Sequence, residues 1–90
     1  MQTQELISIA SQVRRDILRM VHGCQSGHPG GSLGCTDLLV SLYFDAMNLK
    51  LNATNDQVDF NMSGLNEDVF FLSNGHISPV LYSVLARRGY

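Results

Sequence analysis

Charge is scarce in this chain of 90 residues, of which only 16% are Asp, Glu, Lys or Arg. A small free-standing domain has much surface for its volume, and an average globular protein carries about 25% charged residues. Six basic residues against eight acidic ones give a net charge of −2. This balance excludes the basic field of a protein that binds nucleic acid along the phosphate backbone.

Long hydrophobic runs and cysteine clusters are missing as well. The richest apolar stretch, Leu38 to Met47, is interrupted by Ser41 and Asp45, and it is shorter than the roughly 20 residues that span a bilayer. We therefore expect no membrane partner. Two cysteines are too few for a disulfide framework. The first residues lack the basic flank and apolar core of a signal peptide, so we expect a cytoplasmic protein with free thiols.

Hydrophobic periodicity predicts two helices in the first half of the chain. Apolar side chains recur every three or four residues from Thr3 to Val21, which predicts an amphipathic helix. A second helix is predicted from Leu33 to Asn48, with Ser32 as its N-cap. This second helix is apolar around all but one narrow stripe, a pattern typical of a helix that is buried on most sides.

The second half of the chain predicts one strand and one more helix. Val69 to Leu72 is a short apolar run, typical of a buried strand in a parallel sheet. The last helix is predicted to start near Ile77, with Ser78 and Pro79 in its first turn. A single strand leaves its backbone groups without partners. The sequence therefore predicts an α/β fold in which three helices and one strand are a piece of a larger protein.

The turn between this strand and the last helix is a candidate ligand site. It contains Asn74, Gly75 and His76. Ligands of parallel α/β sheets bind at the C-terminal ends of strands, where the N–H groups of a helix N-terminus attract anions. Gly75 lets the backbone approach a phosphate, and His76 can donate a hydrogen bond. A plain strand–turn–helix connection with an incidental histidine is the alternative.

A glycine-rich loop from Ser26 to Gly34 is a second candidate site. His28, held beside Pro29, is a restrained proton donor or acceptor near neutral pH. The loop is not a P-loop, because no Lys-Ser/Thr pair follows, and no glycine triplet fits the dinucleotide fingerprint. An ordinary connection between two helices is the alternative.

A structural zinc site is a third hypothesis and the least favoured one. The spacing of the candidate ligands matches no usual zinc arrangement, and packing of both cysteines as small hydrophobes is the favoured alternative. We therefore predict no metal ligand in this chain. The candidate ligands are His22, Cys24, His28 and Cys35.

Several short motifs occur in a specific order along the chain. They are Arg-Arg-Asp-Ile-Leu at 14–18, Ser-Gly-His-Pro-Gly-Gly-Ser-Leu-Gly at 26–34, Phe-Leu-Ser-Asn-Gly-His at 71–76, Pro-x-Leu-Tyr at 79–82 and Arg-Gly-Tyr at 88–90. In this order they resemble the start of transketolase, and most closely the N-terminal subunit of split transketolases. The resemblance runs from about Ile9 to Tyr90. It departs from the family pattern at Asn52 to Glu67, a segment that is longer and lacks the usual proline and tryptophan.

The resemblance implies the N-terminal fragment of a parallel-sheet fold that binds thiamin diphosphate, with residues 1–90 as an incomplete domain. It implies a transferase of carbohydrate metabolism, in the pentose phosphate pathway, which moves a two-carbon ketol unit from a ketose phosphate to an aldose phosphate. His76 aligns with the histidine that contacts the cofactor diphosphate. His28 aligns with an active-site histidine that hydrogen-bonds substrate oxygens and assists proton transfer. Ser26 and Ser73 are weaker candidates beside them.

The family's other functional residues have no counterpart in this chain. The family binds a divalent cation, Mg or Ca, through a Gly-Asp-Gly motif and a later Asn, and neither occurs here. Neither Glu5 nor Glu67 stands in the context of the glutamate that activates the cofactor ring. The resemblance therefore implies a chain that is inactive alone. Its partners would be sugar phosphate substrates and the remainder of a transketolase, or a C-terminal subunit, in a dimeric assembly. The alternative is a non-catalytic helical interaction module that retains family-like motifs.

Overall fold

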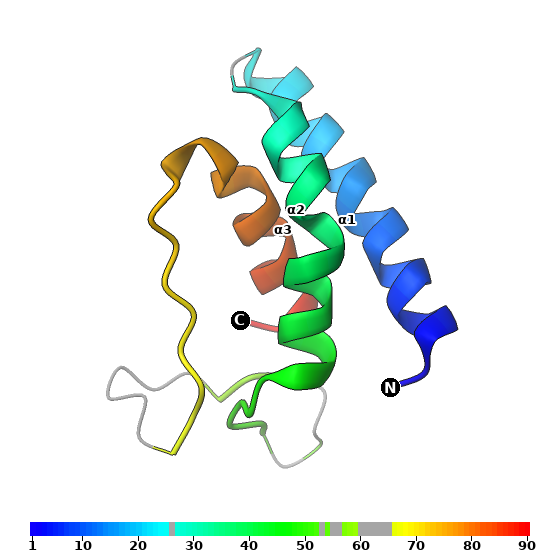
Figure 1. The fold of residues 1–90 in the computed structure, drawn as a ribbon, viewed down its shortest axis with the longest axis vertical. Helices are drawn as coiled ribbons and strands as arrows, with labels where there is room; N and C mark the ends of the chain where they lie inside the picture. The colour runs from blue at the N-terminus through cyan, green and yellow to red at the C-terminus, as the bar shows by residue number, and fades with distance from the viewer. Residues whose placement is uncertain (26, 53, 55–56, 60–65) are drawn as a thin grey trace.

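Three α-helices and two short helical turns form the regular structure of the described part of this chain (Figure 1). The structure is a computed structural model and describes residues 1–25, 27–52, 54, 57–59 and 66–90. Each α-helix contacts the other two, and the turns extend the end of α2 and precede α3. In chain order the elements are α1 Thr3–Cys24, α2 Pro29–Ser41, η1 Leu42–Ala46, η2 Gly75–Ile77 and α3 Ser78–Arg88.

The first and last helices follow their predicted patterns. The apolar stripe of α1 faces the other helices, and its Val13 and Ile17 are completely buried. Helix α3 has Pro79 in its first turn and ends at Gly89, whose φ of 106° is the left-handed conformation that favours glycine. Both predictions are confirmed.

Helix α2 begins four residues earlier than the periodicity predicts. Pro29 is its first residue and His28 precedes it in extended conformation. Proline suits this position because its fixed φ matches the helix and its missing N–H has no helical acceptor there. The prediction of Ser32 as N-cap is therefore wrong. Ser32 lies inside the helix, fully buried, and its hydroxyl has no hydrogen-bond partner among the described residues.

The core lies where the three helices meet. Each of the three contributes apolar side chains that are shielded almost completely from solvent, and η1 adds Tyr43. This burial of apolar surface is the main stabilising contribution to a helical unit of this size. The buried side chains are Ala10, Val13, Ile17, Leu39, Val40, Tyr43, Ile77, Val80 and Val84.

The predicted strand Val69–Leu72 is not a strand in the structure. These residues are extended, and none of their backbone groups is hydrogen-bonded to another described residue. Phe70 and Leu72 pack against the core, whereas the side chains of Val69 and Phe71 point outward, 75% and 87% exposed. A strand forms only with a neighbour, and the described residues supply none. They contain a single isolated bridge, between Leu51 and Val58, and no sheet.

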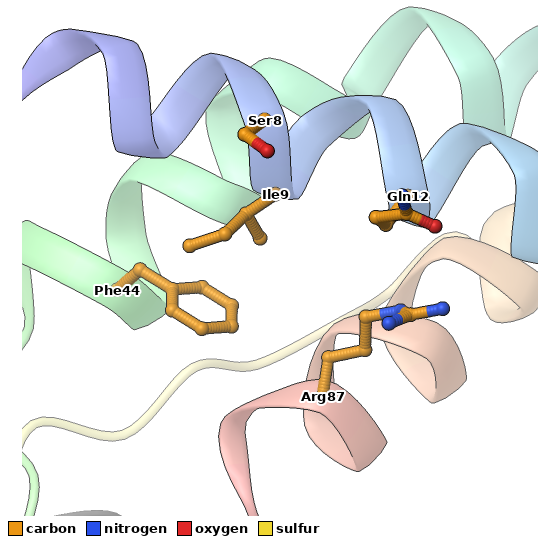
Figure 2. Close-up of a pocket in the computed structure, with 5 residues that line it drawn as sticks. All are labelled: Ser8, Ile9, Gln12, Phe44 and Arg87. Carbon is orange, nitrogen blue, oxygen red and sulfur yellow. The ribbon is translucent and has the colours of Figure 1, made fainter.

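The π-helical turn η1 continues α2 to Ala46, two residues short of the predicted end. The widened turn leaves the Tyr43 carbonyl oxygen to accept a hydrogen bond from Nε of Arg88, 2.9 Å away. The Arg88 guanidinium also lies 5.7 Å from the centre of the Phe44 ring, a cation–π geometry. Beside η1 is a cavity of about 220 Å³ (Figure 2), and it is lined by Ser8, Ile9, Gln12, Phe44 and Arg87.

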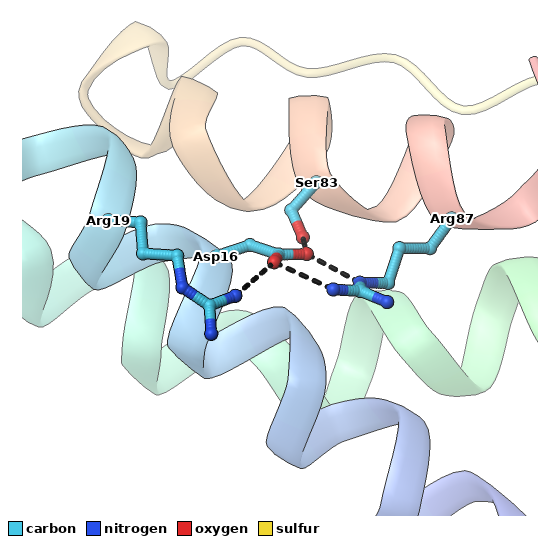
Figure 3. Close-up of polar contacts among 4 residues, drawn as sticks. All are labelled: Asp16, Arg19, Ser83 and Arg87. Carbon is cyan, nitrogen blue, oxygen red and sulfur yellow. Dashed lines mark hydrogen bonds and ion pairs between the residues drawn. The ribbon is translucent and has the colours of Figure 1, made fainter. Parts of the chain in front are cut away.

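A carboxylate on α1 joins this helix to α3 (Figure 3). The oxygens of Asp16 accept hydrogen bonds from Nε of Arg87 at 2.5 Å, from a terminal nitrogen of Arg87 at 2.8 Å and from the Ser83 hydroxyl at 2.8 Å. Arg19, on the same helix as Asp16, adds a pair at 3.3 Å. The Arg87 hydrogen bonds lower the pKa of Asp16, and Ser83 and Arg19 act in the same direction against partial burial.

No helix in the described part of the chain is both long and apolar enough to span a membrane.

Candidate functional site

His28 lies at the entrance to α2. Its φ and ψ of −121° and 111° are extended, and Pro29 fixes the direction in which the helix leaves. The His28 side chain does not cap the first turn of α2 with a hydrogen bond. The imidazole is exposed. His28 therefore stands at a helix N-terminus, where backbone N–H groups carry partial positive charge.

His76 lies in the turn that leads into α3. The side-chain oxygen of Asn74 accepts a hydrogen bond from the His76 N–H at 3.1 Å, and the Ser78 hydroxyl donates to the Gly75 carbonyl oxygen at 2.6 Å. These two contacts fix η2 at both ends. The sequence identified the Asn-Gly-His turn as a candidate site, but it did not predict that Asn74 caps the turn.

The structure brings these two histidines together, although 48 positions separate them in the sequence. The ring centres of His28 and His76 are 6.2 Å apart, and the ring planes are almost perpendicular at 88°. Figure 1 shows the start of α2 and the turn before α3 at the same end of the helical unit. Both histidines are exposed, so a ligand from solvent can reach both rings.

The elements that carry the two histidines touch beside them. A Cβ atom built on Gly31 would lie 2.9 Å from Cγ2 of Ile77, so only glycine allows this approach. Ile77 is 8% exposed and belongs to the core. The core thus holds η2 against the first turn of α2.

This arrangement suits an anion. Two imidazoles supply N–H donors, and the first turn of α2 adds backbone N–H groups. Phosphate oxygens accept hydrogen bonds of both kinds. The His76 ring and the N–H groups of α2 therefore suit the diphosphate group that the sequence resemblance implies, and the His28 ring lies beside them, with its centre 6.2 Å from that of His76.

Two other groups of predicted residues contribute less to the site. Ser73 is exposed in the extended segment, and Ser26 lies outside the described residues. Cys24 and Cys35 are free thiols. Among the described residues, no three His, Cys, Asp or Glu side chains are grouped as ligands for a metal ion.

Comparison with known families shows to which family the chain belongs. Residues 6–90 match the family described as "Transketolase, thiamine diphosphate binding domain". The chain belongs to this transketolase family. The resemblance predicted from the sequence motifs is thereby confirmed.

Named relatives of this transketolase-family chain are considerably longer. It is 29% identical over its whole length to a subunit of apulose-4-phosphate transketolase from Phocaeicola vulgatus, and it covers 29% of that protein. It is 37% identical over 82 residues to transketolase 2 of Escherichia coli, and it covers 11% of that protein. Transketolase-like protein 2 of Mus musculus is 31% identical over 86 residues, with 12% covered. No solved structure matches the chain.

In this transketolase-family chain, sequence reasoning missed the residues that support the two histidines. Ile77 was predicted only as the approximate start of a helix, and its contact with Gly31 joins segments that are far apart in sequence. One signal was available in the run of two adjacent glycines at 30 and 31, which is unusual inside a helix because each glycine costs about 1 kcal/mol there. Such a glycine usually has a packing or functional reason.

Proposed function

We propose that this chain supplies part of the diphosphate-binding half of a transketolase-type active site. The complete enzyme would transfer a two-carbon ketol unit from a ketose phosphate to an aldose phosphate. One observation carries the proposal: the rings of His28 and His76 converge, at 6.2 Å, beside a helix N-terminus. Membership of a family of thiamine diphosphate binding domains supports the choice of ligand.

Thiamin diphosphate, when bound, supplies the electron sink for breaking the carbon–carbon bond of the ketose. In the proposed site, His76 donates a ring N–H to a diphosphate oxygen. The side-chain oxygen of Asn74 accepts a hydrogen bond from the His76 backbone N–H at 3.1 Å, so the His76 ring extends from a fixed turn. The N–H groups in the first turn of α2 add partial positive charge toward the same anion.

His28 has a different proposed role, toward the substrate. Its imidazole hydrogen-bonds a hydroxyl oxygen of the sugar and takes up or returns the proton of that hydroxyl. An imidazole suits this task because its unperturbed pKa lies close to neutrality. The extended conformation before Pro29 projects His28 out of the helix, where solvent and substrate reach it.

The remaining parts of the active site are proposed to come from other segments. The chain covers 29% of the apulose-4-phosphate transketolase polypeptide and 11% of transketolase 2. We propose that a further polypeptide segment or subunit provides the Mg or Ca site and the glutamate that activates the cofactor ring, within a dimeric assembly. Residues 1–90 alone would then catalyse no transfer.

The extended segment Val69–Leu72 is proposed to become a strand of a parallel sheet in that assembly. Its backbone groups have no partners among the described residues. We expect amide hydrogen exchange at 69–72 to be fast in the chain alone and about a hundredfold slower in the complete enzyme. Exchange can be measured by mass spectrometry, with the α1 core as the internal reference. Equally fast exchange in the complete enzyme would contradict the strand.

Replacing His76 by alanine tests the proposed cofactor site. A hydrogen bond to a charged group contributes about 1.5–3 kcal/mol, so His76→Ala should weaken binding of thiamin diphosphate roughly ten- to a hundredfold. Binding of thiamin, which lacks the diphosphate, should be unchanged. Both affinities can be measured by titration calorimetry, or by NMR shifts where binding is weak.

His22→Ala is the matched control for this experiment, because His22 is also exposed but lies in the last turn of α1, outside the ring pair. This variant should bind thiamin diphosphate like the unchanged chain. Equal affinities for the unchanged chain and His76→Ala would rule out the assignment of His76. A folded chain with no preference for thiamin diphosphate over thiamin would favour the non-catalytic interaction module instead.

A further inference from the structure

The contact between Gly31 and Ile77 is a close approach between the two turns that bear the histidines. Gly31 follows His28 by three residues, about one helical turn, and Ile77 directly follows His76. The hypothetical Cβ of Gly31 lies 2.9 Å from Cγ2 of Ile77, a separation that real Cβ atoms essentially never show. The two turns that carry the histidines can therefore approach this closely only because residue 31 has no side chain.

Ile77 has little freedom to move away from an added methyl group. It is buried in the same cluster as Val80 and Val84, at the junction of η2 and α3. Its Cγ2 is attached directly to the branched Cβ, so this methyl shifts only if χ1 or the backbone shifts. An alanine at position 31 therefore requires χ1 of Ile77 or one of the two backbones to shift. Because Ile77 is packed in the core, we expect the turn η2 to move, and His76 with it.

From this packing we infer that Gly31 is a positioning residue, which sets the separation of His28 and His76 by letting Ile77 rest against the first turn of α2. The consequence for cofactor affinity rests on the proposed function, whereas the consequence for ring separation does not. In this role the missing side chain of Gly31 acts through Ile77, and not through a contact with cofactor or substrate.

The neighbouring residue Gly30 provides a matched control. It lies in the same first turn of α2, but a Cβ built on it meets no atom within 4 Å. Gly30→Ala and Gly31→Ala make the same chemical change one residue apart, with the same gain in helix propensity. Any difference between the two variants therefore reports the contact with Ile77.

A compensating change can restore the contact. Ile77→Leu keeps the side-chain volume but removes the branch at Cβ, and with it the Cγ2 methyl that an alanine at position 31 would strike. Core exchanges of isoleucine and leucine are usually tolerated. The double variant Gly31→Ala with Ile77→Leu should therefore return η2 to its place.

The experiment measures ring separation and melting temperature in the chain of residues 1–90. Nuclear Overhauser effects between ring protons of His28 and His76 should be present in the unchanged chain and in Gly30→Ala. They should be lost or reduced severalfold in Gly31→Ala and regained in the double variant. The melting temperature should fall in Gly31→Ala only.

Two results would overturn the inference. One is a Gly31→Ala chain that keeps the ring-to-ring effects, and the other is a folded double variant that fails to regain them. Should Gly31→Ala prove unfolded, the double variant Gly31→Ala with Ile77→Leu is compared with Ile77→Leu alone. Ring-to-ring effects that are present in Ile77→Leu but absent from the folded double variant would then contradict the inference.

Affinity for thiamin diphosphate separates this inference from the proposed function. We expect Gly31→Ala to weaken binding about tenfold, because small displacements of positioned groups have large effects, and the double variant to recover it. Restored ring contact with no thiamin diphosphate binding in any variant would contradict the proposed function and leave the role of Gly31 intact.

Discussion

Replacing His28 by alanine should lower turnover of the complete enzyme by about two to four orders of magnitude. General acid–base catalysis by a positioned side chain contributes about this much, and alanine offers no group that takes up or returns a proton. His28 is exposed at the entrance to α2, with its ring centre 6.2 Å from that of His76. The measurement is the rate of two-carbon transfer in an enzyme that contains residues 1–90 together with the further segment or subunit proposed to complete the active site.

Replacing the two histidines should affect different quantities, the turnover for His28 and the cofactor affinity for His76. His28→Ala should reduce kcat while the affinity for thiamin diphosphate changes by less than about threefold, whereas His76→Ala should act first on that affinity. His28→Gln is a useful companion, because it keeps a hydrogen-bond donor and removes the titratable group. It should recover substrate binding but little of the turnover. A normal rate for His28→Ala would refute the proposed proton-transfer role.

Replacing Asp16 by asparagine should destabilise the chain by about 1–2 kcal/mol. The carboxylate accepts two hydrogen bonds from Arg87 and one from Ser83, and it is only 20% exposed. Each hydrogen bond to a charged group contributes about 1.5–3 kcal/mol, and the partial exposure of Arg87 reduces the total. In a chain of this length the melting temperature should fall by about 4–15 °C.

The matched control is Asp37→Asn. Asp37 makes an ion pair with Arg14 at 3.0 Å, but its side chain is 75% exposed. Exposed pairs of this kind contribute at most about 1 kcal/mol and often nothing measurable. Equal losses of stability in the two variants would mean that the link between α1 and α3 does not depend on Asp16.

The sign of the pH dependence gives a second check on the same variant. The pKa of Asp16 is lowered from 3.8 in the folded chain, so its stabilising contribution is complete above the pKa of the unfolded chain. This contribution is lost as the pH falls through the lower, folded pKa. The stability difference between the unchanged chain and Asp16→Asn should therefore be full at neutral pH and shrink steadily below about pH 4.

Hydrophobic periodicity predicted the two amphipathic helices α1 and α3. The stripes of α1 and α3 follow from spacing alone, because each helix buries one face in a core that this chain supplies. The start of α2 was not predicted, since Ser32 is a good N-cap residue and the proline three positions earlier is a stronger start signal in this context. The strand predicted at 69–72 does not form among the described residues, because strand formation depends on a neighbouring strand as well as on composition.

The candidate site could be predicted only in part. Each histidine was identified from its local motif and from the family resemblance. The 6.2 Å separation of their ring centres, however, is set by tertiary packing. It depends on Ile77 packing into the core and on the missing side chain of Gly31. The contact between Gly31 and Ile77 leaves no periodic signal in the sequence, because the two residues are 46 positions apart.

The outward side chains of Val69 and Phe71 have a consequence for the cell that makes this chain. An extended segment with exposed aromatic and β-branched side chains, and with backbone groups that no described residue pairs, is a template for intermolecular pairing. In the proposed assembly neighbouring strands cover this edge, so the chain alone should aggregate more readily than the assembly as its concentration rises.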